Sequence, residues 1–204
     1  MSIPRARRTP LAALLVVLVI TAGCGRDPQP GPYTADAGLH RDVAAADRLY
    51  REAVAVIDDD PEAGEALLRA ALGHDLFHGP AHNNLGVLFL RRDRLYEAAS
   101  EFEWARKLLP GHPDPRVNLA MALERGGKHG DALTACHAAL QVQPGYLPAI
   151  QTAAYIRLRH DLHDDPASDS ADILARLAEI ESRSGDPTWR DWAKRWRLRL
   201  TADG

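Results

Sequence analysis

Aromatic residues and cysteines are scarce in this sequence. Phe, Trp and Tyr make up 6% of its 204 residues, although hydrophobic residues together account for 46%. Alanine supplies much of that hydrophobic fraction, which suits tightly packed helices. The two cysteines, Cys24 and Cys136, allow no more than one disulfide, so a fold held by several disulfides is excluded. The composition is that of an ordinary globular chain, large enough for one domain.

Long apolar runs are also missing. The longest, Leu11 to Ile20, has ten residues, whereas a helix needs about twenty to cross a bilayer. It follows the basic residues Arg5, Arg7 and Arg8 and precedes the small-residue stretch 21–24. This order is typical of a secretory signal and not of a permanent membrane helix.

The end of that segment resembles the cleavage box of bacterial lipoproteins. Ala22, Gly23 and Cys24 match the box, while Thr21 stands where the family prefers Leu, Val or Ile. The resemblance implies that Cys24 is lipidated and becomes the first residue of the mature chain, which its acyl chains would hold on a membrane. The acidic residue that retains some lipoproteins on the inner membrane is absent directly after Cys24. We therefore expect outer-membrane attachment facing the periplasm; the outer face of the cytoplasmic membrane and secretion are the alternatives.

A positive charge excess is absent as well. The chain has 25 Lys and Arg against 28 Asp and Glu, and residues 1–23 hold three of the basic residues and none of the acidic ones. The mature chain would thus have 22 basic and 28 acidic residues, a net charge of about −6, which argues against nucleic-acid binding. With Cys24 lipidated, Cys136 has no partner within the chain, and we expect it to act as a small buried hydrophobic residue.

The centre of the sequence repeats itself at an offset of 34 residues. The matching pairs are Leu85 and Leu119, Gly86 and Ala120, Phe89 and Leu123, Ala98 and Ala132, Phe102 and Cys136, Ala105 and Ala139, and Pro110 and Pro144. A fixed period of this length indicates stacked units, each burying its apolar face on its neighbours. All pairs except the prolines are therefore predicted to form the repeat core.

This pattern resembles the tetratricopeptide repeat (TPR) family. The family has large, small and large apolar residues on a first helix, then Ala, an aromatic residue and Ala on a second helix followed by Pro. Helical spacing of the same residues and short turns at 92–94 and 126–128 independently predict antiparallel helical hairpins. We predict an all-α fold, namely an α-solenoid of antiparallel helix pairs that forms a TPR-like right-handed superhelix with a C-terminal capping helix.

The predicted organisation has seven segments. They are a lipoprotein signal peptide (1–23), lipidated Cys24 with a flexible linker (24–40), a degenerate first repeat (41–78), two full repeats (79–112 and 113–146), a degenerate repeat with an extended turn (147–185) and the capping helix (186–204). The capping helix holds Trp189, Trp192 and Trp196. These residues either pack on the preceding helix or contact anionic lipid or a partner, and their burial distinguishes the two possibilities.

The TPR resemblance implies that ligands bind in a concave groove lined by the first helices. The corresponding residues here are Asn83, Asn84, Val87, Leu90, Arg91, Val117, Asn118, Met121, Arg125, Gln151, Tyr155 and Arg159. Our hypothesis is that a partner segment packs on the apolar residues and offers carboxylates or carbonyls to the three arginines. The alternative is that these arginines are merely solvated at turn edges.

Signals for catalysis or metal binding are weak. His74, His78 and His82 have a spacing that metals can use, but no carboxylate or Cys completes a ligand set. We predict no metal site and solvated histidines at a repeat junction. The sequence also lacks a Ser-His-Asp context, a Gly-rich phosphate loop and paired catalytic carboxylates, so we expect no enzyme activity and no cofactor.

These features predict a membrane-anchored TPR scaffold that binds a protein or peptide partner in the bacterial cell envelope. An assembly or pilotin-like factor for an outer-membrane machine, serving pili, barrel insertion or peptidoglycan enzymes, is the alternative. An enzyme accessory subunit is a more remote one. The identity of the partner and the oligomeric state stay open.

Overall fold

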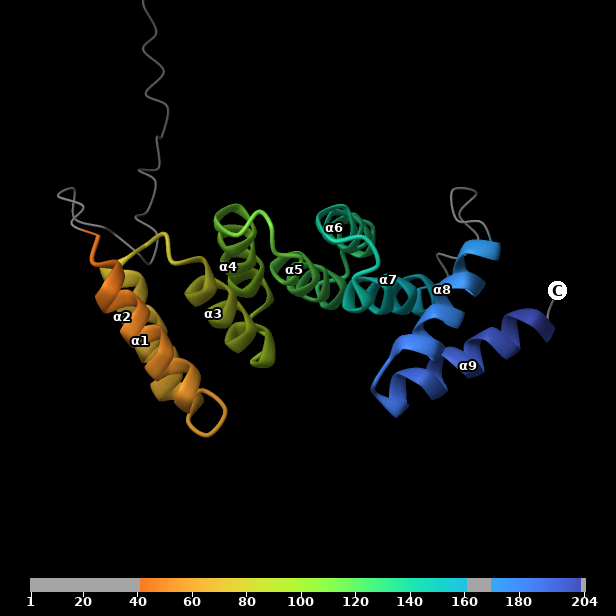
Figure 1. The fold of residues 1–204 in the computed structure, drawn as a ribbon, viewed down its shortest axis with the longest axis horizontal. Coiled ribbons are helices and arrows are strands. Elements are labelled where there is room, and N and C mark those ends of the chain that lie inside the picture. Colours follow the sequence, from red (N-terminus) through yellow and green to blue (C-terminus); the bar gives the residue numbers. More distant parts are fainter. Residues whose placement is uncertain (1–40, 161–169, 203–204) are drawn as a thin grey trace, which may run out of the picture. The chain divides into compact units, whose positions relative to one another are not determined.

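The computed structural model describes residues 41–160 and 170–202. Every regular element within them is an α-helix (Figure 1). The helices are α1 (Val43–Val56), α2 (Pro61–His74), α3 (Gly79–Arg91), α4 (Leu95–Leu108), α5 (Asp114–Arg125), α6 (His129–Val142), α7 (Leu147–Arg159), α8 (Ser170–Arg183) and α9 (Pro187–Ala202). The predicted signal peptide, lipidated Cys24, linker and most of the extended turn lie outside the described residues.

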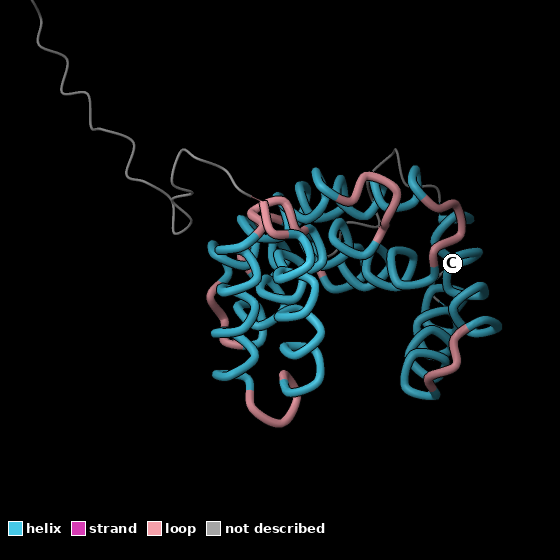
Figure 2. Tube along the Cα trace, turned by 60° about the vertical axis from the view of Figure 1, so that its left-hand side comes forward, coloured by secondary structure: helices cyan, strands magenta, loops and turns pink. Residues whose placement is uncertain are grey.

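Consecutive helices pack as antiparallel pairs (Figure 2). The pairs are α1 with α2, α3 with α4, α5 with α6, and α7 with α8. Each later pair also contacts the one before it, through α2 and α3, α4 and α5, and α6 and α7. The predicted all-α array of stacked helix pairs is therefore confirmed. None of the described helices combines the length and apolar character needed to cross a bilayer.

The turns have the backbone geometry that their residues favour. Asp93 and Gly127, in equivalent turns, have φ of 60° and 75°, and Gly145 has 74° after α6. Gly adopts this left-handed region without steric cost, and Asp tolerates it better than most residues. At the start of α2 the side chain of Asp60 accepts a hydrogen bond from the Ala63 amide at 2.9 Å, and Pro61 occupies the first helical turn. These residues let the chain reverse after α3, α5 and α6 and fix the start of α2.

The core of the two central units lies at the seams between their helices. Phe102 is fully buried, and a Cβ added to Gly86 would lie 2.6 Å from its ring, so the two helices can approach only because residue 86 has no side chain. The other buried residues of the predicted core are Leu85, Phe89, Ala98, Ala105, Leu119, Ala120, Ala132, Cys136 and Ala139. Leu123 differs, because it is only half-buried and borders a surface cavity of about 380 Å³ between α4, α5 and α6.

The last helix packs on the end of the array. Ala193 is fully buried in a cluster with Leu177 and Ile180 of α8, and with residues of α7. Trp189, Trp192 and Trp196 are half-buried and pack against the same cluster. Their burial favours the capping interpretation over direct insertion into lipid, since the rings are already engaged in the stack.

Candidate functional site

A surface cavity lies on the first-helix face, at the junction of α5, α7 and α9. It is open to solvent and has a volume of about 710 Å³. It is lined by Asp93, Met121, Glu124, Arg125, Gly127, His129, Thr152, Tyr155, Ile156, Arg159, His160 and Trp189. Four predicted groove residues, Met121, Arg125, Tyr155 and Arg159, thus meet here. We call this cavity the α5–α7 pocket.

One wall of the α5–α7 pocket is apolar and aromatic. Met121 is 43% exposed, which is high for a large hydrophobic side chain in the middle of a packed array. Tyr155 and Trp189 line the pocket as well, and the rings of Tyr155 and Trp192 lie 6.4 Å apart between their centres. An exposed apolar wall inside a concave site is the usual setting for a ligand's hydrophobic group.

The chain itself supplies partners on the polar side of the pocket except at His129 Nδ1, which is buried and has no hydrogen-bond partner in the described part of the chain. The His129 and His160 rings stack at 3.5 Å between ring centres, and His160 Nε2 lies 3.1 Å from Glu124 Oε1. The Arg159 guanidinium adds a second, longer contact to Glu124 and covers the Tyr155 ring at 5.4 Å. A ligand would therefore meet an apolar floor with a nearly neutral polar rim.

The three repeated arginines act within the array. Arg91 contacts Asp58 at 3.1 Å, Arg125 contacts Asp93 at 2.6 Å, and Arg159 approaches Glu124 at 3.8 Å. In each case the carboxylate belongs to the preceding helix pair. Arg125 also donates to the backbone carbonyl of Leu90 at 2.7 Å. Our hypothesis gave these arginines carboxylates or carbonyls of a partner segment; in the structure each of them contacts a carboxylate of the chain itself.

Two other predicted groove residues are not available to a partner. Val117 is 5% exposed and packs in a cluster with Ala139 and Ala149, and Leu90 is 7% exposed. Both side chains are buried in the packed array, so the prediction that they line the groove is wrong. Val87 and Gln151 remain half-exposed, and Gln151 donates to the Ser184 hydroxyl at 3.3 Å.

The predicted asparagines form a polar row beside a smaller cavity. Asn118 donates to Asn83 at 3.0 Å, and Asn84 donates to the Tyr50 hydroxyl at 3.4 Å. Tyr50, Asn83 and Asn84 border a cavity of about 250 Å³ at the start of α3 and α5. These amides therefore link neighbouring first helices and retain further hydrogen-bonding capacity.

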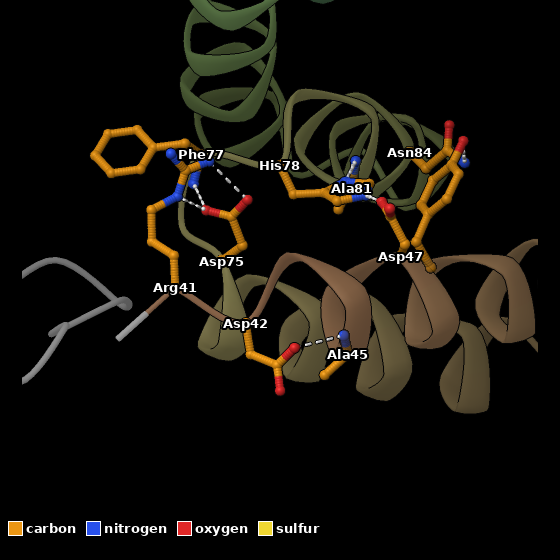
Figure 3. Close-up of polar contacts among 10 residues, drawn as sticks. Arg41, Asp42, Ala45, Asp47, Asp75, Phe77, His78, Ala81 and Asn84 are labelled. Atoms are coloured by element: carbon orange, nitrogen blue, oxygen red, sulfur yellow. Dashed lines mark hydrogen bonds and ion pairs between the residues drawn. The ribbon is translucent and has the colours of Figure 1, made fainter. Parts of the chain in front are cut away.

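His78, before α3, and His82, within it, are buried, which corrects the prediction that they are solvated. Figure 3 shows the contacts of His78. His78 Nδ1 accepts a hydrogen bond from the Ala81 amide at 3.0 Å, so Nε2 carries the proton and donates to Asp47 at 3.1 Å. His82 Nε2 donates to the Leu76 carbonyl at 2.9 Å, and its Nδ1 lies 2.6 Å from Glu101 Oε2. His78 therefore caps the start of α3. This cap was not predicted from the sequence, although His78 directly precedes Gly79-Pro80, where the helix begins.

No group of three His, Cys, Asp or Glu residues in 41–160 and 170–202 is placed to hold a metal ion.

An ion pair near the start of the described chain has a structural role. Arg41 makes two contacts with the buried Asp75 carboxylate, at 2.8 and 3.0 Å, and its guanidinium also lies over the Phe77 ring (Figure 3). The Arg41 guanidinium lowers the pKa of Asp75 below its ordinary value, against a smaller opposing effect of burial.

Comparison with known proteins supports the architecture. No family model and no curated protein matches this sequence. Among solved structures, the first TPR of Spaghetti (RPAP3), bound to the HSP90 peptide SRMEEVD, is similar at a TM-score of 0.57 and 15% identity, over 61% of this chain and 99% of that chain. MamA from Desulfovibrio magneticus RS-1 is similar at a TM-score of 0.59 and 17% identity, over 69% of this chain and 78% of that one. This chain has a TPR-like fold.

An O-GlcNAc transferase of Thermobaculum terrenum gives a TM-score of 0.57 at 25% identity. The TPR-like array covers 76% of this chain in that comparison but only 27% of the transferase. The shared part is thus a fraction of a much longer enzyme. Similarity at these identities establishes the fold, and the function has to be argued from the site.

Proposed function

We propose that this chain is a protein-binding scaffold of the bacterial cell envelope that holds a segment of its partner in the α5–α7 pocket. The observation that carries the proposal is the apolar wall of that cavity, formed by the exposed Met121 and the half-buried Tyr155 and Trp189. Similarity to the first TPR of Spaghetti, whose structure holds a bound peptide, supports the same use of the fold. Binding of this kind needs no catalysis by the scaffold.

The pocket favours an apolar anchor. A partner side chain packed on Met121 and Tyr155 would remove its own surface and theirs from water, which contributes about 25 cal/mol per Å² of apolar area. Because Arg125 and Arg159 already have acceptors in the chain, closing the pocket would leave no cation without a partner. Well-packed aromatic walls of this type carry most of the energy in protein interfaces.

Site-specific photo-crosslinking in intact cells tests the pocket. A photoreactive amino acid placed at Met121 should form adducts with a defined envelope protein, identified by mass spectrometry. The same amino acid at Tyr96, which is 86% exposed and lies outside the pocket, is the matched control. Equal adduct patterns at the two positions would contradict a partner site in the pocket. Components of a pilus, barrel-insertion or peptidoglycan machine among the adducts would favour the assembly-factor alternative.

We further propose that Cys24 carries the lipid that anchors the scaffold to the outer membrane. Support comes from the sequence, in which a basic start, a short apolar run and small residues precede the Cys. Metabolic labelling with an alkyne fatty acid should mark the parent chain and not a Cys24→Ser variant. Fractionation should then place the labelled chain with outer-membrane material. An unlabelled parent chain would overturn the anchor and leave the binding proposal intact.

A further inference from the structure

The cavity of about 380 Å³ between α4, α5 and α6, here called the α4–α6 cavity, has a filled counterpart in the preceding unit. Four residues of its lining come from α5 and α6, namely Arg116, Leu123, Ala135 and Ala138. At the 34-residue offset of the repeat they correspond to His82, Phe89, Glu101 and Trp104. Two alanines and a leucine thus replace a carboxylate, an indole and a phenyl ring, which leaves the space open.

In the preceding unit the larger side chains contact one another. His82 Nδ1 lies 2.6 Å from Glu101 Oε2, and the rings of Trp104 and His82 stack at 5.6 Å between their centres. His82 is fully buried and Glu101 is 4% exposed. The α3–α4 unit therefore fills this position with a carboxylate and an indole, both placed against one basic side chain.

The α5–α6 unit keeps a basic side chain at this position and lacks both of those groups. Arg116 is half-buried, lines the cavity and donates to the His112 carbonyl at 2.9 Å, but it forms no ion pair within the described residues. Burial, together with the nearby Arg106 cation, lowers the pKa of Arg116 below its ordinary value. An added carboxylate would stabilise this guanidinium, as Glu101 does not in its own unit for any arginine.

The other charged residues of the lining leave Arg116 without an acidic partner. Arg106 already pairs with Glu103 at 2.6 Å. Because α5 and α6 are antiparallel, Asp131 in the first turn of α6 lies at the end of the cavity away from Arg116, which is in the first turn of α5. The Arg116 end therefore offers a cation beside the apolar surface of the alanines of α6.

We infer that the α4–α6 cavity binds a small aromatic carboxylate, with its ring in the space at Ala138 and its carboxylate on Arg116. The ring would bury apolar surface where Trp104 does so in the preceding unit. The guanidinium would fix its orientation through charge-assisted hydrogen bonds. A cavity of about 380 Å³ lies within the usual range for small-molecule sites, about 300 to 1,000 Å³. This site is separate from the α5–α7 pocket, and the inference goes beyond the proposed function.

Ligand-observed NMR titration of the purified full chain tests the inference. The probe is indole-3-propionate, which combines an indole ring with a carboxylate. Indole-3-propionamide has the same ring without the charge, and hexanoate has the charge without the ring. Indole-3-propionate should bind with a Kd of about 1 mM or lower. Each of the other two compounds should bind at least about tenfold more weakly.

Two variants locate the site. Arg116→Gln should weaken binding of indole-3-propionate to the level of the amide and leave amide binding unchanged. Ala138→Trp restores the residue of the preceding unit and should abolish binding of both indoles by filling the cavity. Matched controls are Arg195→Gln, which removes an exposed cation from α9, and Ala70→Trp, which adds an indole at an exposed position of α2. Neither control should change binding.

Several outcomes would overturn the inference. They are the absence of binding by indole-3-propionate, equal binding of the acid and the amide, and a preference for the acid that survives Arg116→Gln. Circular dichroism checks the fold of each variant, and Arg116→Gln decides alone if Ala138→Trp does not fold. Tyr155→Ala should leave binding unchanged, since a loss there would place the indole in the α5–α7 pocket instead. Failure of the crosslinking at Met121 would overturn the proposed function and leave this site intact.

Discussion

Gly86 shows at the scale of one residue how tightly the central hairpin is built. An added methyl group would lie 2.6 Å from the Phe102 ring, well inside van der Waals contact. Gly86→Ala should therefore lower the free energy of unfolding by about 1 to 3 kcal/mol through overpacking. Gly73→Ala is the matched control, since nothing lies within 4 Å of its added Cβ. There the better helix propensity of Ala should raise stability by up to about 1 kcal/mol. Urea unfolding measures both, and equal shifts would contradict the close approach.

Cys136 gives a second prediction for a single side chain. Burial raises the pKa of its thiol to about 12, so the folded chain has almost no thiolate at neutral or mildly alkaline pH. Labelling with a thiol reagent in a Cys24→Ser background should thus be slow in buffer and fast in denaturant. The neutral thiol also contributes stability that is present below the ordinary thiol pKa and lost as the pH rises through the raised value. Rapid labelling of folded chain would show that residue 136 is exposed.

Individual side chains also mark the limit of prediction from the sequence. Period and size were enough to find Gly86 and Phe102, because packing at a repeated seam admits few residue types. They were not enough for Val117 and Leu90, whose burial depends on a rotation of the helix face by less than one residue. The pairing of Arg125 with Asp93 could not be predicted either, since it depends on how two turns approach in space.

At the scale of the element, helix α2 depends on its cap. The Asp60 carboxylate accepts a hydrogen bond from the Ala63 amide, which otherwise has no partner in the first turn. Asp60→Ala should lower the free energy of unfolding by about 0.5 to 2 kcal/mol. Asp59→Ala removes the same charge from the same exposed loop without touching the cap. Thermal unfolding followed by circular dichroism compares them, and similar losses would indicate a general charge effect.

The start of α1 is held to the α2–α3 junction by Arg41 and Asp75. Because the pKa of Asp75 is lowered in the folded chain, its contribution is present above the ordinary carboxyl pKa of about 3.9 and is lost as the pH falls through the lower folded value. Asp75→Asn should therefore be less stable than the parent at neutral pH, and the difference should shrink in strong acid. Urea unfolding at both pH values measures this, with Arg48→Gln as a variant that should show no such trend. A difference independent of pH would contradict the ion pair.

The element scale also shows where turn chemistry could be anticipated. Gly126-Gly127-Lys128 and Arg92-Asp93-Arg94 were predicted as turns, and the structure places positive φ at the middle residue of each. The histidine cap of α3 was missed, since His is an uncommon capping residue and its Nδ1 acceptor depends on the donor role of Nε2 toward Asp47. The periodicity of the sequence predicted the type and order of the helices. The tautomer of His78 depends instead on which groups its ring contacts in the folded chain.

For the whole array, α9 covers apolar surface that the preceding pairs leave open. Removal of residues 187–204 would expose Leu177, Ile180 and their neighbours, which are now fully buried. We expect the shortened chain to unfold at a lower temperature and to self-associate, as repeat arrays without a polar terminal cap do. Calorimetry and size-exclusion chromatography test this. Leu198→Ser, at a solvent-facing position of α9, should change neither property. A shortened chain with unchanged stability would show that the helix is an appendage.

Arg91, Arg125 and Arg159 each reach back to an acidic residue of the preceding hairpin. These ion pairs connect adjacent hairpins along one edge and limit how far the hairpins can move apart. Because the arginine of each pair is exposed, added salt screens these ion pairs while the apolar seams stay closed. Under an applied force the array should therefore extend more easily at high than at low ionic strength. Its elasticity would then vary with salt concentration even when its fold does not change.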